Sequence, residues 1–186
     1  MEKPYSDKEL WSAASTAGLF IGGVAVLYSL ITSFIGAHSS ESVALNVITA
    51  IIQVILWAAK LFGCIFLTGY FIRKFVSAHE GVTRSGAFRF GLATAILAAL
   101  LYSAYFLVSA LYIQPEAMEA AFNTILSSGV SSLDSNTLDA IEKIKDNFPL
   151  IGFFSNLIYC FLWGLVLSSI YSHKAVSDNP FESDAQ

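Results

Sequence analysis

The strongest constraint on the fold is a thirty-residue apolar run, Val43–Ile72, in which the only charged residue is Lys60. As an α-helix this run is ~45 Å long at ~1.5 Å per residue, whereas the hydrocarbon core of a bilayer is ~30 Å thick. Arg73 and Lys74 follow it directly. The run therefore predicts a membrane-spanning helix that is tilted or that projects beyond the bilayer.

Three further apolar runs have the same character, so the sequence predicts four spans, at about 12–37, 43–72, 86–113 and 150–171. Hydrophobic residues make up 55% of the chain and charged residues only 13%, a composition typical of integral membrane proteins. Too little polar chain remains for a separate soluble domain. We therefore predict an all-α polytopic membrane protein, with residues 1–186 forming one domain and the four transmembrane helices one bundle.

The one sizeable polar segment covers residues 115–148. Pro115 suits the first turn of a helix, and Glu116 and Glu119 would lie near the positive end of that helix. Two stripes of apolar residues at helical spacing follow, separated by a stretch rich in Gly and Ser. The pattern predicts an extracytoplasmic helical hairpin that lies against the membrane or the bundle.

The distribution of basic residues predicts the orientation. One side of the predicted topology carries most of them, namely Lys3, Lys8, Arg73, Lys74, Arg84, Arg89 and Lys174. The other side holds Lys143 and Lys145. Because cytoplasmic loops are enriched in Lys and Arg, both termini and the loop between the second and third spans are predicted to be cytoplasmic.

Small residues recur at every fourth position in three of the spans. In lipid, burial of apolar surface does not drive helices together, so close backbone approach and polar contacts must do so. The residues predicted to mediate helix packing are Gly18, Gly22, Gly91, Ala95, Gly164 and Ser168. These faces fit either packing within the bundle or an interface with a second copy or another membrane protein.

The sequence contains no recognisable catalytic constellation. His38, His79 and His173 are scattered over loops, and no metal-binding or phosphate-binding motif occurs. Cys64 and Cys160 fall inside apolar runs, where a cysteine is usually a small buried side chain. No Asp or Glu lies within a predicted span, which argues against a transporter that relies on an intramembrane carboxylate. We therefore predict no enzymatic activity, no metal and no cofactor, and the net charge of −4 argues against a nucleic-acid partner.

Lys60 is the candidate functional residue, because it lies close to the predicted bilayer midplane. A charged side chain there costs ~2.5–3.5 kcal/mol on insertion scales, and intramembrane ionisable residues generally face protein or water. We expect Lys60 to face the bundle interior and to mark a ligand-binding site. The alternative is a tolerated lysine that reaches water through a tilted helix or a local bilayer defect.

Four other residues complete the predicted ligand site. Gln53 and Trp57 share the helical face of Lys60, at offsets of seven and three residues. Tyr105 and Asn156, from the third and fourth spans, are predicted to supply polar groups to the interior.

Three short motifs carry a resemblance to a known family. They are EGVTRSGAFRFG at 80–91 entering the third span, YIQPE at 112–116 opening the acidic segment, and DNPF at 178–181 in the tail. In order and spacing they resemble the bacterial four-span family called domain of unknown function 4199. The resemblance implies a bacterial inner-membrane protein with four spans. It implies no activity and no site residues, and Lys60 is not part of its pattern.

Two functional hypotheses remain open. The first is a non-enzymatic bacterial inner-membrane protein that contacts membrane lipids and acts as a subunit or scaffold of a membrane assembly. The alternative is a binder or transporter of a small anionic or lipid ligand that uses Lys60. Co-purification of a stoichiometric partner would favour the first hypothesis, and a retained ligand near mid-bilayer would favour the second.

Overall fold

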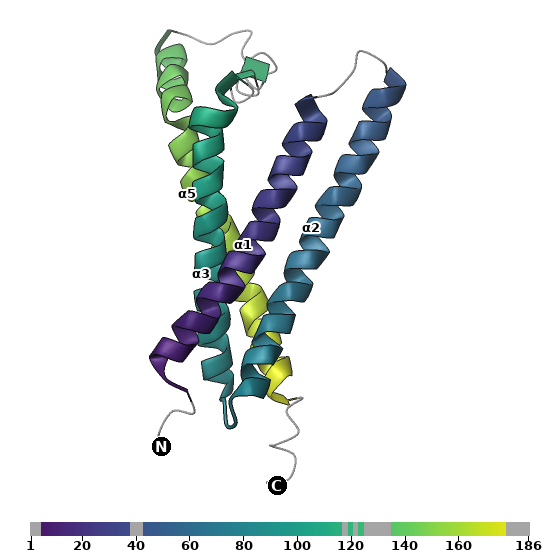
Figure 1. The fold of residues 1–186 in the computed structure, drawn as a ribbon. Coiled ribbons are helices and arrows are strands. Elements are labelled where there is room, and N and C mark those ends of the chain that lie inside the picture. Colours follow the sequence, from purple (N-terminus) through teal and green to yellow (C-terminus); the bar gives the residue numbers. More distant parts are fainter. Residues whose placement is uncertain (1–4, 38–42, 117–118, 121–122, 125–134, 178–186) are drawn as a thin grey trace.

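The computed structural model describes residues 5–37, 43–116, 119–120, 123–124 and 135–177, and all regular structure in them is helical. The long helices are α1 (Asp7–Ala37), α2 (Val43–Ala78), α3 (Arg84–Val108) and α5 (Ser135–Ser177), and a short π-helix, η1 (Ser109–Ile113), continues α3 (Figure 1). The predicted turn of the outer hairpin and the predicted tail motif lie outside the described residues.

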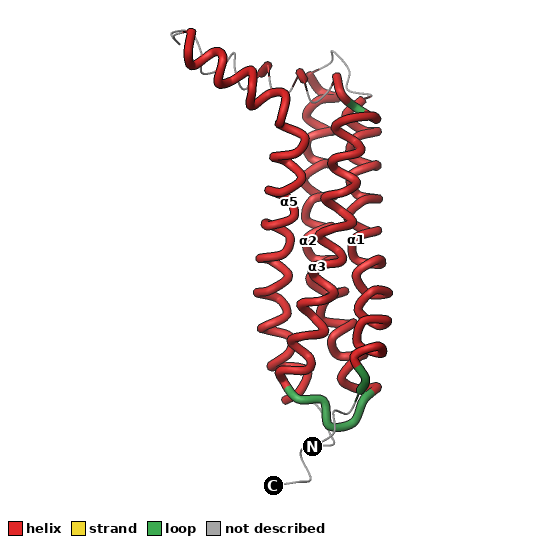
Figure 2. Tube along the Cα trace, turned by 90° about the vertical axis from the view of Figure 1, so that its left-hand side faces the viewer, coloured by secondary structure: helices red, strands yellow, loops and turns green. Residues whose placement is uncertain are grey.

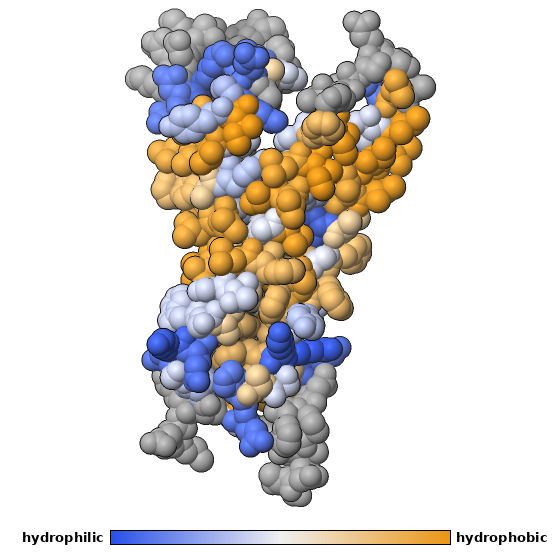
Figure 3. Space-filling view, viewed as in Figure 1, coloured by the Kyte–Doolittle hydropathy of each residue, from blue (hydrophilic) through white to orange (hydrophobic). Residues whose placement is uncertain are grey.

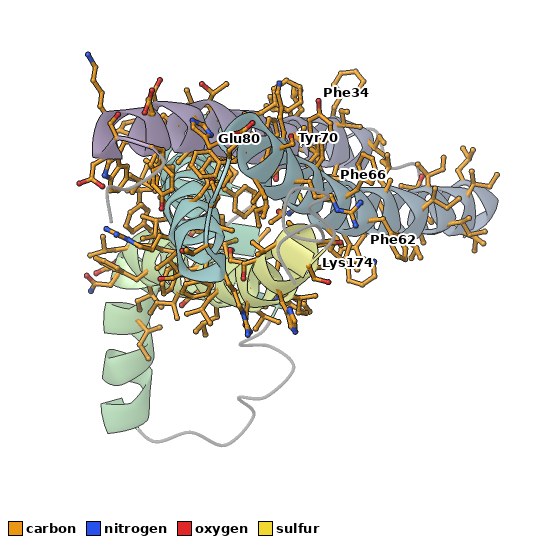
Figure 4. All side chains as sticks on the ribbon, turned by 90° about the horizontal axis from the view of Figure 1, so that it is seen from below. Phe34, Phe62, Phe66, Tyr70, Glu80 and Lys174 are labelled. Atoms are coloured by element: carbon orange, nitrogen blue, oxygen red, sulfur yellow. The ribbon has the colours of Figure 1, made fainter. Side chains whose placement is uncertain are left out.

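Four helical stretches are long and apolar enough to cross a membrane, as the sequence predicts. They are Asp7–Ile35, Leu45–Ala78, Arg84–Ile113 and Ile144–Ser177. On the face that Figure 3 shows, apolar residues cover the middle of the molecule, and hydrophilic residues gather towards its two ends. Seen along the bundle, Phe62 and Phe66 lie on the outer side of α2 (Figure 4), where both rings are largely exposed. Such a surface is suited to lipid rather than to water.

Side-chain caps set where α1 and α3 begin. The Ser6 backbone N–H donates to a carboxylate oxygen of Glu9 at 2.7 Å, and the Glu9 N–H donates back to the Ser6 hydroxyl at 3.2 Å. This reciprocal pair is a capping box, and the N–H from Ser6 holds the pKa of Glu9 below its usual value. At α3 the Thr83 hydroxyl accepts the Gly86 N–H at 3.2 Å, after a turn in which Gly81 has φ +74°.

Helix α5 differs from the predicted fourth span, because it does not begin near Leu150. It starts at Ser135 and continues through Pro149, so residues 135–148 are its first turns rather than a separate helix of a hairpin. A proline inside a helix removes one backbone hydrogen bond and commonly produces a kink. The first part of α5 leans away from the other helices accordingly (Figure 2).

Helix α3 lies at the centre of the arrangement. It packs extensively against α1 and α5, whereas α2 packs less closely against all three. The four helices converge at the end where both termini lie, and α1 and α2 lean away from α3 and α5 at the other end (Figure 1). The half of α2 that lies away from the termini, residues 45–56, is therefore exposed on almost every side. We call it the outer half of α2.

The small residues singled out in the sequence lie at helix contacts within the chain. A Cβ added at Gly18 would come within 2.7 Å of the Leu97 Cβ, and one at Gly22 within 2.9 Å of a Leu101 methyl group, so α1 approaches α3 closely. Between α3 and α5, an added Cβ at Gly91 would lie 2.6 Å from the Ser168 hydroxyl oxygen.

The same α3–α5 interface contains a second close contact. A Cβ added at Gly164 would overlap the Ala95 methyl group. The contact at Gly91 also involves α2, because the Ile72 Cδ1 would lie 3.0 Å from the added Cβ. Small residues thus bring the backbones of α3 and α5 together.

The buried core lies at the end of the bundle that carries the termini. There the rings of Phe75 and Phe90 stack with centroids 4.3 Å apart, and Tyr5 contacts Phe75 edge to face at 5.2 Å. Tyr5, Phe75 and Phe90 are all buried. This aromatic cluster joins the N-terminal segment to α2 and α3.

Candidate functional site

Lys60 occupies the middle of α2 and turns its side chain into the bundle. Its ammonium nitrogen lies 4.8 Å from the centroid of the Tyr28 ring on α1 and 4.4 Å from the centroid of the Tyr102 ring on α3. Each contact is a cation–π interaction, worth ~0.5–2 kcal/mol depending on how far the pair is desolvated. The lysine therefore joins three helices through two aromatic rings.

The charge of Lys60 has no acidic partner within the helices. The sequence contains no Asp or Glu in residues 43–79, 81–115 or 147–177. Within the part of the chain that the structure describes, no group accepts a hydrogen bond from its ammonium. Aromatic rings attract the positive charge, but they do not replace the oxygen acceptors that an ammonium has in water. The three N–H groups of Lys60 therefore suit an anionic or strongly polar ligand.

The Lys60 side chain lines a cavity of about 220 Å³ to which all four long helices contribute. Gly22 and Ala25 of α1 and Ala98 and Ala99 of α3 form part of its apolar wall. Small side chains at these positions leave the space open, because larger ones would fill it. A mostly apolar cavity with a few polar groups is the usual form of a ligand site.

The structure brings together some of the residues that the sequence predicts for the site. Trp57 and Asn156 line the cavity with Lys60. Gln53 is exposed on the outer half of α2, and Tyr105 is partly buried but outside the cavity wall. Gln53 is remote because α2 leans away from the bundle one to two turns beyond Lys60.

Several wall residues were not predicted as ligand contacts. They are Cys64, Tyr102, Tyr159, Cys160 and Trp163. Tyr28, which contacts Lys60 but does not line the cavity, was not predicted either. The helical offset of Cys64 from Lys60 and the depth of Tyr102 in its span are signals that the sequence does contain. The contact of Tyr28 depends on the angle at which α1 crosses α2, and no sequence pattern gives that angle.

Part of the cavity wall is exposed to the surroundings of the bundle. Trp57 on α2 is 57% exposed, and Tyr159 and Trp163 on α5 are 59% and 44% exposed, although all three line the cavity. The rings of Tyr159 and Trp163 contact each other with centroids 6.4 Å apart. We call these three side chains the aromatic rim. They mark the seam between α2 and α5 as the open side of the cavity.

The cavity is elongated along the helices. Lys60 and Thr68 on α2 are eight residues apart, and so are Tyr102 and Thr94 on α3, which runs in the opposite direction. Eight residues of helix correspond to ~12 Å at ~1.5 Å per residue. The ammonium thus lies towards one end, and the two threonines line the other end.

A charged contact also joins two segments near the start of α5. Lys145 of α5 forms an ion pair with Glu119, which draws the segment after η1 towards α5. The hydrogen bond and the positive charge of Lys145 hold the pKa of Glu119 below its usual value. This pair lies outside the cavity, and we assign it a structural role.

A comparison with known protein families assigns the chain to one of them. The model of the family described as a protein of unknown function, DUF4199, matches residues 16–172. The chain belongs to this family. The match covers all of the cavity wall and most of each long helix, and it confirms the family resemblance seen in the sequence. No curated protein and no solved structure matches the chain.

Proposed function

We propose that this DUF4199 protein is an integral membrane protein that binds an acidic amphiphile, a molecule with one anionic group and one apolar chain. The anion contacts the Lys60 ammonium, and the apolar chain occupies the rest of the cavity. The observation that carries the proposal is the position of Lys60, held inside an apolar cavity by two tyrosine rings without an acidic partner.

The shape of the cavity supports an elongated ligand. Between Lys60 and the two threonines the wall is formed by apolar and thiol side chains, among them Cys64, Ala95 and Cys160. An apolar cavity about 12 Å long, at ~1.5 Å per residue over the eight residues between its two ends, suits a hydrocarbon chain. Asn156 adds an amide near the charged end, where its Nδ2 donates to the Gly152 carbonyl at 3.0 Å and keeps a second hydrogen for the ligand.

The aromatic rim supports entry from the lipid phase. Trp57, Tyr159 and Trp163 are half exposed on the surface that would face lipid, at the seam of the least closely packed helix. The small-residue contacts of Gly22 and Gly164 with α3 close the α1–α3 and α3–α5 sides. An amphiphile dissolved in the bilayer therefore reaches Lys60 by moving sideways between α2 and α5.

The four long apolar helices and the basic residues support the location that we propose. We place the protein in the bacterial inner membrane with both termini in the cytoplasm, on the side that carries Arg73, Lys74 and Arg84. The role that we propose is binding or transport, because the cavity wall is mostly apolar and offers the Lys60 ammonium and the Asn156 amide as groups that recognise an anion.

Tryptophan quenching tests the proposal directly, because two of the three tryptophans line the cavity. In a Trp11→Phe background the fluorescence comes from Trp57 and Trp163 alone. We expect dibromostearate, added to protein in lipid nanodiscs, to quench this fluorescence saturably. Its quenching should occur at concentrations well below those that its neutral methyl ester requires. The ester controls for quenching by brominated chains that merely dissolve in the surrounding lipid.

The matched variant is Lys60→Met, which keeps the length of the side chain and removes its charge. It should bind the acid and the ester equally, because only the ammonium distinguishes them. If the wild-type protein shows no preference for the acid, or if Lys60→Met keeps that preference, the proposed function is wrong.

The subunit or scaffold role stays a prediction. Gly18, Gly22, Gly91 and Gly164 already lie against neighbouring helices of the same chain, so those faces are not free for a partner. Recovery of a stoichiometric partner protein with the purified chain would favour the scaffold role.

A further inference from the structure

The far end of the cavity contains a buried hydroxyl without a partner. Thr94 is 2% exposed, lines the cavity, and its Oγ1 has no hydrogen-bond partner among the described residues. Other helical hydroxyls donate to a carbonyl of the preceding turn, as those of Thr16, Thr32, Thr68 and Ser168 do. Buried polar groups are rarely left unpaired, so each exception needs an explanation.

The surroundings of Thr94 offer little else that is polar. Thr68 lines the same end, but its hydroxyl donates to the Cys64 carbonyl at 2.8 Å. Ile65 and Leu167 complete this part of the wall. The Thr94 hydroxyl is therefore a polar group presented to whatever fills an otherwise apolar end.

Ser103 provides an internal comparison. Its hydroxyl is also buried and unpaired among the described residues, but Ser103 does not line the cavity. The Ser103 hydroxyl is therefore enclosed by helix packing, whereas the Thr94 hydroxyl can form a hydrogen bond with a ligand in the cavity. The difference between the two positions separates a folding effect from a binding effect.

We infer that the amphiphile bound at Lys60 carries a second polar group, a hydroxyl or carbonyl oxygen, ~12 Å from its anion along the helix axis, and that this group hydrogen-bonds with Thr94. The inference rests on the proposed function and narrows its ligand class from simple acids to acids that carry an oxygen near the far end of the chain. Thr94 would then determine specificity, and Lys60 would supply the charge recognition.

Competition between two acids of equal chain length tests this inference. Decanoate and ω-hydroxydecanoate each displace dibromostearate, and displacement is read as recovery of Trp57 and Trp163 fluorescence. When the chain of ω-hydroxydecanoate is extended, its hydroxyl and carboxylate are separated by a distance comparable to the ~12 Å between the two ends of the cavity. A neutral hydrogen bond in a site of this kind changes affinity about fivefold.

The measured quantity is the ratio of the two affinities, compared between wild-type protein and Thr94→Val, so that differences in lipid partitioning of the two acids cancel. We expect the ratio to shift about fivefold in favour of decanoate in Thr94→Val, because valine keeps the shape and removes the hydroxyl. Thr94→Ser, which restores a hydroxyl, should return the ratio towards the wild-type value. The control Ser103→Ala, at a position outside the cavity wall, should leave it unchanged.

An identical ratio in wild-type protein and Thr94→Val would overturn the inference while leaving acid binding at Lys60 intact. A shift of the same size in Ser103→Ala would also overturn it, because the effect would then come from packing. If neither acid displaces dibromostearate from the wild-type protein, the proposed function fails, and this inference fails with it.

Discussion

Replacing Gly164 by alanine tests whether α3 and α5 are held together by close backbone approach. An added Cβ would overlap the Ala95 methyl group and would lie 3.3 Å from the Ala95 Cα, so the neighbour is backbone and a rigid methyl rather than a flexible side chain. The helices must therefore move apart. Overpacking of this kind typically costs ~1–3 kcal/mol of the free energy of unfolding.

The chain contains a matched control for this substitution. Gly63 on α2 has open space around its Cβ position, so Gly63→Ala adds the same methyl group without a clash. It should be neutral or stabilising by up to ~1 kcal/mol through helix propensity alone. At ~2–4 °C per kcal/mol for a chain of this size, Gly164→Ala should lower the melting temperature by ~2–12 °C, and Gly63→Ala should not lower it.

The decisive measurement is a double-mutant cycle, with unfolding followed in mixed micelles by tryptophan fluorescence. Ala95→Gly removes the methyl group that Gly164→Ala meets, so the double variant should recover stability, with a coupling energy of ~0.5–3 kcal/mol. Additive effects of the two substitutions, or equal effects of Gly164→Ala and Gly63→Ala, would refute the close contact between α3 and α5.

Three further predictions concern the ends of the bundle and its cavity. In a chain whose native cysteines are replaced, Ser77→Cys should react with an impermeant thiol reagent only from the cytoplasmic side and Glu116→Cys only from the opposite side; the reverse pattern would contradict the proposed orientation. Lys145→Ala should raise the pKa of Glu119 towards its usual value, as followed by carboxyl NMR, because the hydrogen bond and charge of Lys145 stabilise the charged form and this contribution is lost as the pH falls through the lowered pKa of Glu119; an unchanged pKa would exclude the pair. Cys64 and Cys160 line the cavity, so stearate should slow their labelling by a membrane-permeant maleimide in wild-type protein but not in Lys60→Met, and equal rates with and without stearate would show that the cavity stays empty.

The sequence was sufficient to predict the four long helices, because an apolar run of this length permits few structures other than a spanning helix. It also pointed to Lys60, since a single lysine in such a run is costly and must find polar or aromatic neighbours. Those neighbours were harder to predict. Trp57 follows from helical spacing on the same helix, but Tyr28 lies on another helix whose crossing angle depends on packing contacts that only the assembled bundle defines.

The start of α5 and the position of Gln53 also differ from what the sequence pattern predicts. The sequence predicts a fourth span that begins at about residue 150, yet α5 begins at Ser135 and continues through Pro149, because neighbouring turns and a kink can accommodate a proline inside a long helix. Gln53 shares the helical face of Lys60, but α2 leans away from the bundle before that residue is reached. Periodicity assigns a residue to a face of its helix, whereas the tilt of the helix decides whether that face meets the cavity.

Native mass spectrometry of the protein extracted from its own membrane tests the ligand proposal most directly. We predict that the wild-type protein carries one bound acidic amphiphile, identified by fragmentation in negative mode, and that Lys60→Met loses it. The control Gln53→Met, on the exposed outer half of α2, should retain it. Wild-type protein without a bound acid, or equal retention by Lys60→Met, would contradict the role assigned to Lys60.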